Sequence, residues 1–185
     1  MEKININNIV ATASISDKLN LELINELIPN SEYNKKRFPG LIYRQKMPKT
    51  ALLIFSSGKV VCTGAKTMKE AKIAILNVID LLSKFKIHLN KKPDIFVQNI
   101  VATSSLHAEL NLSTIAISLG LENVEYEPEQ FPGLVYRVID PKVVFLICQK
   151  ACPHHRSIDR WLARGCKQPL RRSRFSKNFM VSRVH

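Results

Sequence analysis

The feature that most constrains the fold of this chain is an internal repeat. Residues 38–44 read FPGLIYR, and residues 131–137 read FPGLVYR. A second stretch, Asn-Ile-Val-Ala-Thr at 8–12, returns unchanged at 99–103. Repeated stretches in the same order indicate two copies of one structural unit. We therefore expect two related halves, joined by a linker at Asn90–Pro93.

Hydrophobic periodicity predicts that each half reads strand, helix, antiparallel strands, helix. That order favours the α+β class, with helices on one face of each sheet and the copies related by a pseudo-two-fold axis. The capping box Thr67–Glu70 marks the start of a long amphipathic helix. Strands are expected at 8–12, 40–44, 50–55 and 59–63. A short helix is expected between the first two of these strands, with apolar residues at Leu21, Leu23, Ile24, Leu27 and Ile28, and the second half repeats it with Leu112, Ile115, Ala116 and Leu119. The apolar stripe of the long helix consists of Ala71, Ala74, Ile75, Val78, Leu82 and Phe85.

The sheet face turned away from the helices is the informative one. Strand alternation places Leu53 and Phe55 on it, with Val61 and Thr63 beside them. Asn8 and Val10 can join it from the first strand, and basic side chains surround it at Arg37, Arg44, Lys49, Lys59 and Lys66. An exposed apolar face of this kind indicates a binding partner. The alternative is a second core, covered by another element or by a second copy of the chain.

Charge and cysteine content narrow the partner and the compartment. The net charge is +13, which favours a polyanionic partner. Residues 148–185 hold 10 Lys/Arg and 1 Asp, so most of that charge belongs to the C-terminal tail. No apolar run approaches the ~20 residues of a membrane span, and the N-terminus does not read as a secretory signal. Cys62 is expected to be a small buried or half-buried thiol in a reducing compartment.

Several long motifs carry a resemblance to a known family. They are the doubled FPGL(I/V)YR, QNIVAT at 98–103, YEPEQFPG at 126–133 and SSGKVVCTGAK at 56–66. Over about residues 4–147 the chain resembles the TATA-box-binding proteins, the general transcription initiation factors, in their archaeal form. The resemblance implies a saddle of curved antiparallel sheet with helices on its convex face. It also implies a protein that binds the TATA box in the DNA minor groove, bends it with phenylalanine wedges and nucleates the preinitiation complex.

The resemblance assigns roles residue by residue. Central contacts to the bases fall on Asn8, Val10, Leu53, Val61, Thr63, Asn99, Val101 and Leu146; wedges fall on Phe38, Phe55 and Phe131; phosphate contacts fall on Arg37, Arg44, Lys49, Lys59, Lys66, Arg137 and Lys142. The fourth wedge position falls on Cys148, which is too small for that role.

The resemblance also implies partners and a location. A B-type initiation factor would grip the loop that holds Glu127 and Glu129, and RNA polymerase would join indirectly. Weak self-association is possible, whereas no cofactor, metal or membrane is implied. An archaeal cytoplasm and nucleoid is the expected location, or a nucleus if the source is eukaryotic.

The family pattern stops after Ile147. We therefore expect a complete first repeat at 1–90, a truncated second repeat at 91–147 and a basic, disordered tail at 148–185. The truncated sheet is expected to keep an unpaired edge. Interpretations of the tail are a frameshifted gene end, a basic arm on DNA, or a zinc site formed by Cys148, Cys152, His154, His155 and Cys166.

Two other functions stay open at this point. One is a non-functional or dominant-negative product that retains partial DNA binding. The other is a saddle domain attached to a DNA-repair enzyme, although the chain lacks the HExxH, P-loop and nucleophile–base patterns of an enzyme.

Overall fold

The structure is a computed structural model, which describes residues 4–106, 108–149 and 179–184. The chain forms two compact units. The first is Ile6–Ile100, and the second is Val101–His185 together with the N-terminal residues Met1–Asn5. The boundary between the units follows Ile100, whereas the sequence placed the end of the first repeat at residue 90. Gln98 belongs to the first unit, where its Nε2 donates a hydrogen bond of 3.0 Å to Thr12 Oγ1.

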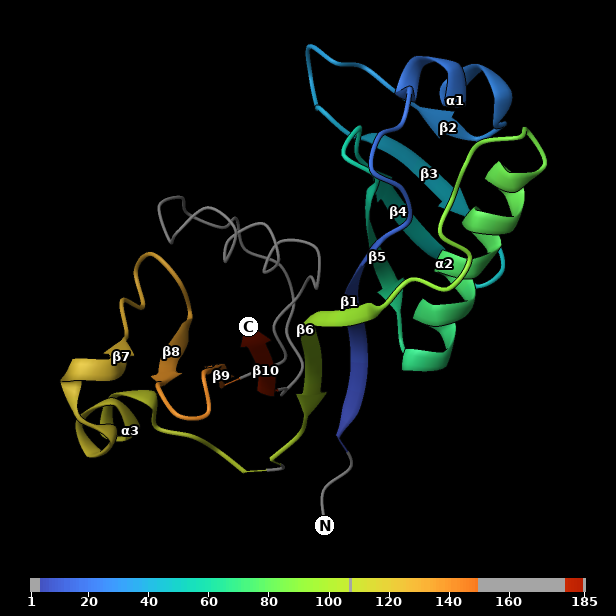
Figure 1. Ribbon diagram of the computed structural model, residues 1–185. Coiled ribbons are helices and arrows are strands. Elements are labelled where there is room, and N and C mark those ends of the chain that lie inside the picture. Colours follow the sequence, from blue (N-terminus) through green and yellow to red (C-terminus); the bar gives the residue numbers. More distant parts are fainter. Residues whose placement is uncertain (1–3, 107, 150–178, 185) are drawn as a thin grey trace. The chain divides into compact units, whose positions relative to one another are not determined.

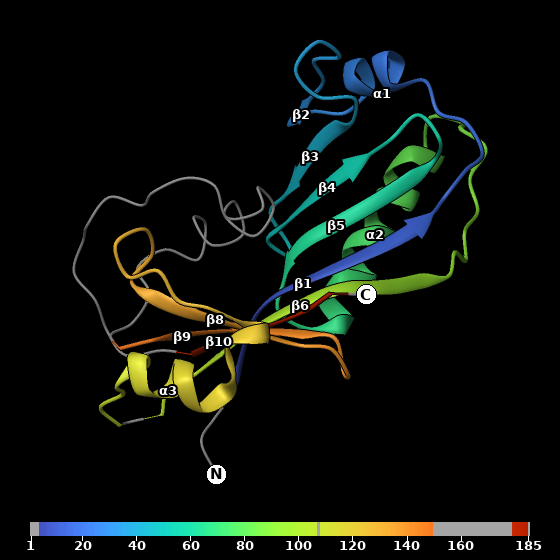
Figure 2. The same ribbon diagram turned by 90° about the vertical axis from the view of Figure 1, so that its left-hand side faces the viewer.

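The first unit is an antiparallel sheet with one long helix across one face (Figures 1 and 2). Its strand order is β2-β3-β4-β5-β1, and it contains the four strands expected from the sequence together with the short β2. The elements are β1 (Asn5–Ser14), α1 (Leu21–Leu27), β2 (Ser31–Glu32), β3 (Leu41–Gln45), β4 (Thr50–Ile54), β5 (Lys59–Ala65) and α2 (Met68–Ser83).

The capping box starts α2 as predicted. The N–H of Glu70 donates to Thr67 Oγ1 at 3.1 Å. The Glu70 carboxylate accepts the N–H of Lys66 at 2.8 Å, one residue before the cap. The predicted stripe is wrong at Phe85, which is 38% exposed because α2 ends at Ser83. The stripe instead includes Ile79, which is buried.

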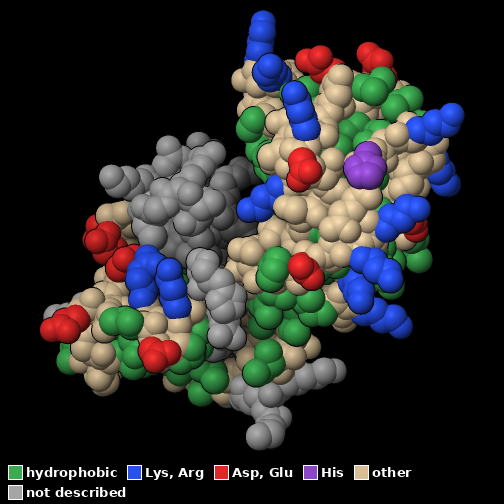
Figure 3. Space-filling view, in the orientation of Figure 1, with side chains coloured by type: hydrophobic (Ala, Val, Ile, Leu, Met, Phe, Trp, Pro, Cys, Tyr) green, Lys and Arg blue, Asp and Glu red, His purple; other side chains and the backbone are tan. Residues whose placement is uncertain are grey.

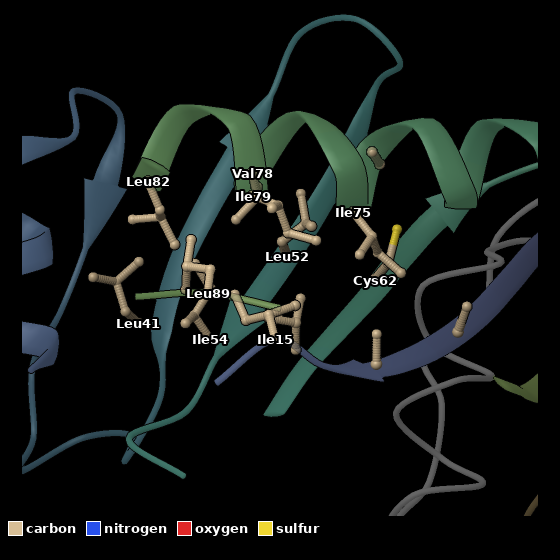
Figure 4. Packing of buried hydrophobic residues seen from close by; sticks show 14 of the residues in the cluster. Ile15, Leu41, Leu52, Ile54, Cys62, Ile75, Val78, Ile79, Leu82 and Leu89 are labelled. Atoms are coloured by element: carbon tan, nitrogen blue, oxygen red, sulfur yellow. The ribbon is translucent and has the colours of Figure 1, made fainter. Parts of the chain in front are cut away.

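The core of the first unit lies between α2 and the sheet (Figure 4). Leu52, Ile54, Val60 and Cys62 of the strands are 0% exposed beneath the helix. Each large apolar side chain removed from water in this way contributes about 1.5–3 kcal/mol. Burial raises the pKa of the Cys62 thiol from its ordinary 9.0 to about 11, and a hydrogen bond with Thr50 opposes that rise. The expectation of a buried thiol is confirmed.

The second unit repeats the short helix and the strand pair. Its strand order is β10-β9-β8-β7. The elements are the second half of β6 (Ile95–Ser104), α3 (Leu112–Leu119), a 3-10 turn (Leu121–Asn123), β7 (Val124–Glu125), β8 (Gly133–Val138), β9 (Val143–Cys148) and β10 (Phe179–Val184). Within the described part of this unit, no helix corresponds to α2.

The expected open edge at β9 is wrong. The strand β10 pairs with it antiparallel, from Phe179 opposite Ile147 to Arg183 opposite Val143. Backbone donors and acceptors of an edge strand are satisfied by a second strand, and the tail provides one despite its lack of alternation. The other candidate features of the tail, including Cys152, His154, His155 and Cys166, lie outside the described residues.

Two of the short-helix residues predicted from spacing are on the surface. Leu23 of α1 is 45% exposed, and Leu119 of α3 is 37% exposed. Both helices are only two turns long, so one face packs on the sheet and their remaining apolar residues meet solvent. Leu21 and Ile24 of α1 enter the core of the first unit, and Leu112 and Ala116 of α3 enter that of the second.

Candidate nucleic-acid interface

The face of the first repeat opposite α2 is an apolar surface, which we name the underside. Its strands are in register, with Leu53 opposite both Ile42 and Val61. These side chains are half-buried, whereas the strand neighbours of Leu53 and Val61 are 0% exposed beneath α2. The underside consists of Asn8, Val10, Ile42, Leu53, Phe55, Val61 and Thr63 together with Phe38 at its end.

Two phenylalanines stand together at one end of the underside. The rings of Phe38 and Phe55 meet edge to face, with centroids 5.9 Å apart and planes at 63°. Gly40 lies beneath them, and a Cβ there would come within 2.7 Å of Phe38 and 3.1 Å of Phe55. The Phe-Pro-Gly motif therefore holds both rings, half-exposed, where a larger residue at 40 would displace them.

Asn8 places an oriented amide in this apolar surface. Its Oδ1 accepts the N–H of Gly64 at 2.7 Å, which fixes the direction of the amide group. Its Nδ2 donates to Thr63 Oγ1 at 3.1 Å. The amide has two hydrogens, so one stays available for an acceptor presented to the underside.

The basic side chains expected around the underside are exposed. Arg44 stands opposite Ala51, at the end of the row that leads to Thr63. Among the described residues, none of these cations forms an ion pair. They are Arg37, Arg44, Lys49, Lys59 and Lys66.

The second repeat has the same strand register but not the same surface. Gly133 stands opposite Cys148, and a Cβ there would come within 2.5 Å of Phe131 and 3.0 Å of the cysteine sulfur. Cys148 thus occupies the place that Phe55 holds in the first repeat. The matched residues Val101, Phe131 and Leu146 are 1%, 7% and 3% exposed. They pack in one cluster with Val135 and Cys148.

The repeated geometry agrees with comparison to known proteins. The family model described as "Transcription factor TFIID (or TATA-binding protein, TBP)" matches residues 3–85 and 94–150. The chain belongs to the TATA-binding protein family. The match stops at residue 150, three residues beyond Ile147, the last residue of the family pattern in the sequence.

Relatives and a solved structure place it beside archaeal members of the family. It is 59% identical over 147 residues to the TATA-box-binding protein of Picrophilus torridus, covering 80% of each chain. It is 52% identical over 145 residues to that of Archaeoglobus fulgidus, covering 78% of this chain and 79% of the relative. The structure of Methanococcus jannaschii TBP aligns with a TM-score of 0.76 at 42% identity, covering 98% of this chain and 88% of that one. The predicted family and fold class are confirmed.

The remaining predicted contacts of this family member differ in their surroundings. Arg137 pairs with Glu125 at 3.2 Å, with the two side chains 43% and 52% exposed. Lys142 is exposed, and Asn99 is half-buried. Glu127 and Glu129 are exposed in the loop before Phe131.

Two features of the described residues bear on other functions. No helix there is long and apolar enough to cross a membrane. In the same residues, no group of three or more His, Cys, Asp or Glu side chains is placed to hold a metal ion.

Sequence reasoning missed two contributors to the underside. Ile42 was not singled out, although strand alternation from Leu41 would have placed it opposite Leu53. Gly64 was not singled out either, and only the fold shows that its N–H orients the Asn8 amide. Asn8 and Gly64 lie 56 positions apart in the chain, so no local pattern connects them.

Proposed function

We propose that this member of the TATA-binding protein family binds A·T-rich promoter DNA in the minor groove through the underside of its first repeat. The observation that carries the proposal is the underside itself. It is an apolar surface with one oriented amide donor at Asn8, and exposed Lys and Arg side chains lie at its margins. In the minor groove an A·T pair presents only acceptors, whereas G·C adds an amino donor. Such a surface is compatible with A·T pairs, and it is mostly apolar where the amino group of guanine would project.

The Phe38–Phe55 pair supports a bending mechanism at this end of the site. A ring inserted between base pairs unstacks one step at a cost of a few kcal/mol, a general magnitude for which this family is itself a source. The bent duplex covers more of the protein surface, and this larger buried area offsets that cost. Because Phe131 is buried and Cys148 has no ring, we expect the bend to be one-sided.

The proposed assembly follows from the second repeat. Glu127 and Glu129 offer an exposed acidic loop to a B-type initiation factor, through which RNA polymerase would join the promoter complex. This role places the protein on the chromosome, in the archaeal cytoplasm. We assign it no catalytic step.

A fluorescence bend assay and a gel shift test the proposal together. We expect the full chain to bind a TATA duplex more tightly than a duplex with G·C substitutions, and to bend one end of it. Phe55→Ala should abolish the bend, whereas Phe85→Ala, which removes an exposed ring outside the underside, should not. Equal affinity for both duplexes would contradict minor-groove readout.

A second candidate function is a dominant-negative factor, because the second repeat has no described counterpart of α2. The same gel shift with added B-type factor separates the two functions. A more slowly migrating band, from a complex of the protein, the B-type factor and DNA, supports a role in initiation. Tight TATA binding without that band supports the dominant-negative function.

A further inference from the structure

The loop that leads into each Phe-Pro-Gly motif has the same backbone in both repeats. In the first repeat, the carbonyl of Asn34 accepts the N–H groups of Arg37 at 3.0 Å and Phe38 at 2.9 Å. In the second, the carbonyl of Glu127 accepts those of Gln130 at 3.0 Å and Phe131 at 2.8 Å. The two loops are therefore one structural turn, built twice.

The charges that this turn presents are opposite in the two repeats. Between Asn34 and Phe38 the chain reads Lys-Lys-Arg, three positive charges. The corresponding turn of the second repeat reads Glu-Pro-Glu-Gln, two negative charges. Structure does not require this reversal, because both sequences form the same two hydrogen bonds. The difference of five charges is therefore a property of the surface.

The basic turn is ordered and open. Asn34 Oδ1 also accepts the N–H of Lys36 at 3.1 Å, which adds a third hydrogen bond to the turn. Lys35, Lys36 and Arg37 are all exposed, and none forms an ion pair with another described residue. Figure 3 shows Lys and Arg side chains projecting from the end of the first unit at which Figure 1 draws the β2–β3 loop.

We propose that Lys35 and Lys36 grip the duplex phosphates outside the wedged step, as an extension of the DNA site that only the first repeat has. This inference rests on the proposed function. The cations immediately precede Phe38 in the chain, so the turn that carries them adjoins the wedge. A DNA strand presents a phosphate about every 3.4 Å along its axis, which places phosphates beside any wedged step. The acidic turn of the second repeat would repel the same phosphates.

The consequence is a built-in polarity. Each Lys that neutralises a phosphate adds about 0.9 to the slope of log affinity against log salt. The turn of the first repeat would hold flanking DNA, and the corresponding turn of the second repeat would not. The chain would then protect one side of the TATA box further than the other.

The test compares Lys35→Gln/Lys36→Gln with Lys91→Gln/Lys92→Gln, which removes two exposed charges from the segment before β6. Binding of the full chain is titrated on a TATA duplex with long flanks at several salt concentrations. We expect the turn variant to lower the salt slope by about 1.8, so that its deficit relative to wild type shrinks about twelve-fold between about 50 and 200 mM salt. The control variant should change the slope by less than half as much.

A hydroxyl-radical footprint gives the second readout. We expect the wild type to protect one flank further than the other, and the turn variant to lose that asymmetry. Equal slopes for the two variants, or an unchanged footprint, would overturn the proposal. A deficit seen only with an added acidic protein would also overturn it, since the turn would then bind protein. If wild type fails to prefer TATA over G·C-substituted DNA, the proposed function fails instead, and the slope comparison on that DNA still decides the role of the turn.

Discussion

Ile54 and Ile147 are the same residue at the same register position of the two repeats, and they have different surroundings. Ile54 pairs with Leu41 and is 0% exposed beneath α2. Ile147 pairs with Leu134 in β9 and stays half-buried beside α3. The opposite faces show the reverse, because Leu53 is half-buried while its counterpart Leu146 is 3% exposed. A strand sequence supplies two possible faces, and the elements packed on them decide which one is the core.

The largest expected effect is on that difference in packing. Ile54→Ala should destabilise the first unit by about 2–5 kcal/mol, because it leaves a cavity beneath α2. Ile147→Ala should cost about 1 kcal/mol, since water already reaches part of the side chain. Chemical denaturation followed by circular dichroism measures both, and equal costs would show that the two faces are covered alike.

Cys62 tests how tightly α2 seals the first sheet. Its pKa rises from 9.0 to about 11 in the folded state, so the unfolded chain loses the thiol proton first as the pH increases. The contribution of the neutral thiol is therefore complete below pH 9.0 and is lost as the pH approaches 11. The loss should be on the order of 3 kcal/mol.

The measurement is the unfolding free energy of wild type and Cys62→Ala below pH 9.0 and near pH 11. From the lower to the higher pH, the free energy of unfolding should fall further for the wild type than for Cys62→Ala. A constant gap would mean that the thiol ionises as easily in the folded protein as in the unfolded chain.

Phe38 and Phe131 separate binding from packing at matched positions. Phe38→Ala should weaken TATA binding by about 10- to 100-fold, because it removes a large, half-exposed aromatic ring from the proposed contact. Phe131→Ala should change the affinity little and cost about 3–5 kcal/mol of stability, because that ring is 7% exposed. Fluorescence anisotropy and thermal unfolding measure the two effects. Similar losses of affinity would show that the second repeat opens to DNA.

Asn8→Asp keeps the acceptor for the Gly64 N–H and removes the amide donor. We expect TATA affinity to fall about 10-fold, within the range of about 1–3 kcal/mol for a well-placed polar contact to a base. Asn111→Asp is the control, because it adds the same charge at the N-cap of α3, where Asp caps as well as Asn. A loss no larger than that of the control would assign the effect to net charge alone.

The smallest expected difference lies between Arg44→Gln and Arg137→Gln. Arg44 has no ion pair among the described residues, so its loss should lower the salt slope by about 0.9. Arg137 is paired with Glu125, and an exposed pair of this kind contributes only about 0–1 kcal/mol to stability. Its replacement should change the slope less. Titration over a range of salt distinguishes them, and a larger change at Arg137 would reverse the assignment.

Local sequence signals predicted much of the first unit. The alternation of 50–63 gave both faces of β4 and β5, and Thr67 with Glu70 gave the start of α2. The features that the sequence did not predict depend on contacts between residues far apart in the chain. Nothing in the sequence around Phe179 indicated that it would pair with Ile147, more than thirty positions earlier. The burial of Leu146 likewise could not be read from its strand, whose alternation matches that of Leu53.

The sequence by itself determined the family, the two repeats and the place where the second departs from the first. It did so because Phe-Pro-Gly turns, strand alternation and helix caps are local chemistry that repeats wherever the residues repeat. The tertiary structure decided which copies of those residues are buried. Phe38 stands half-exposed beside Phe55, while Phe131 is buried beside Cys148. Exposure depends on what packs against a side chain, and distant parts of the chain supply that.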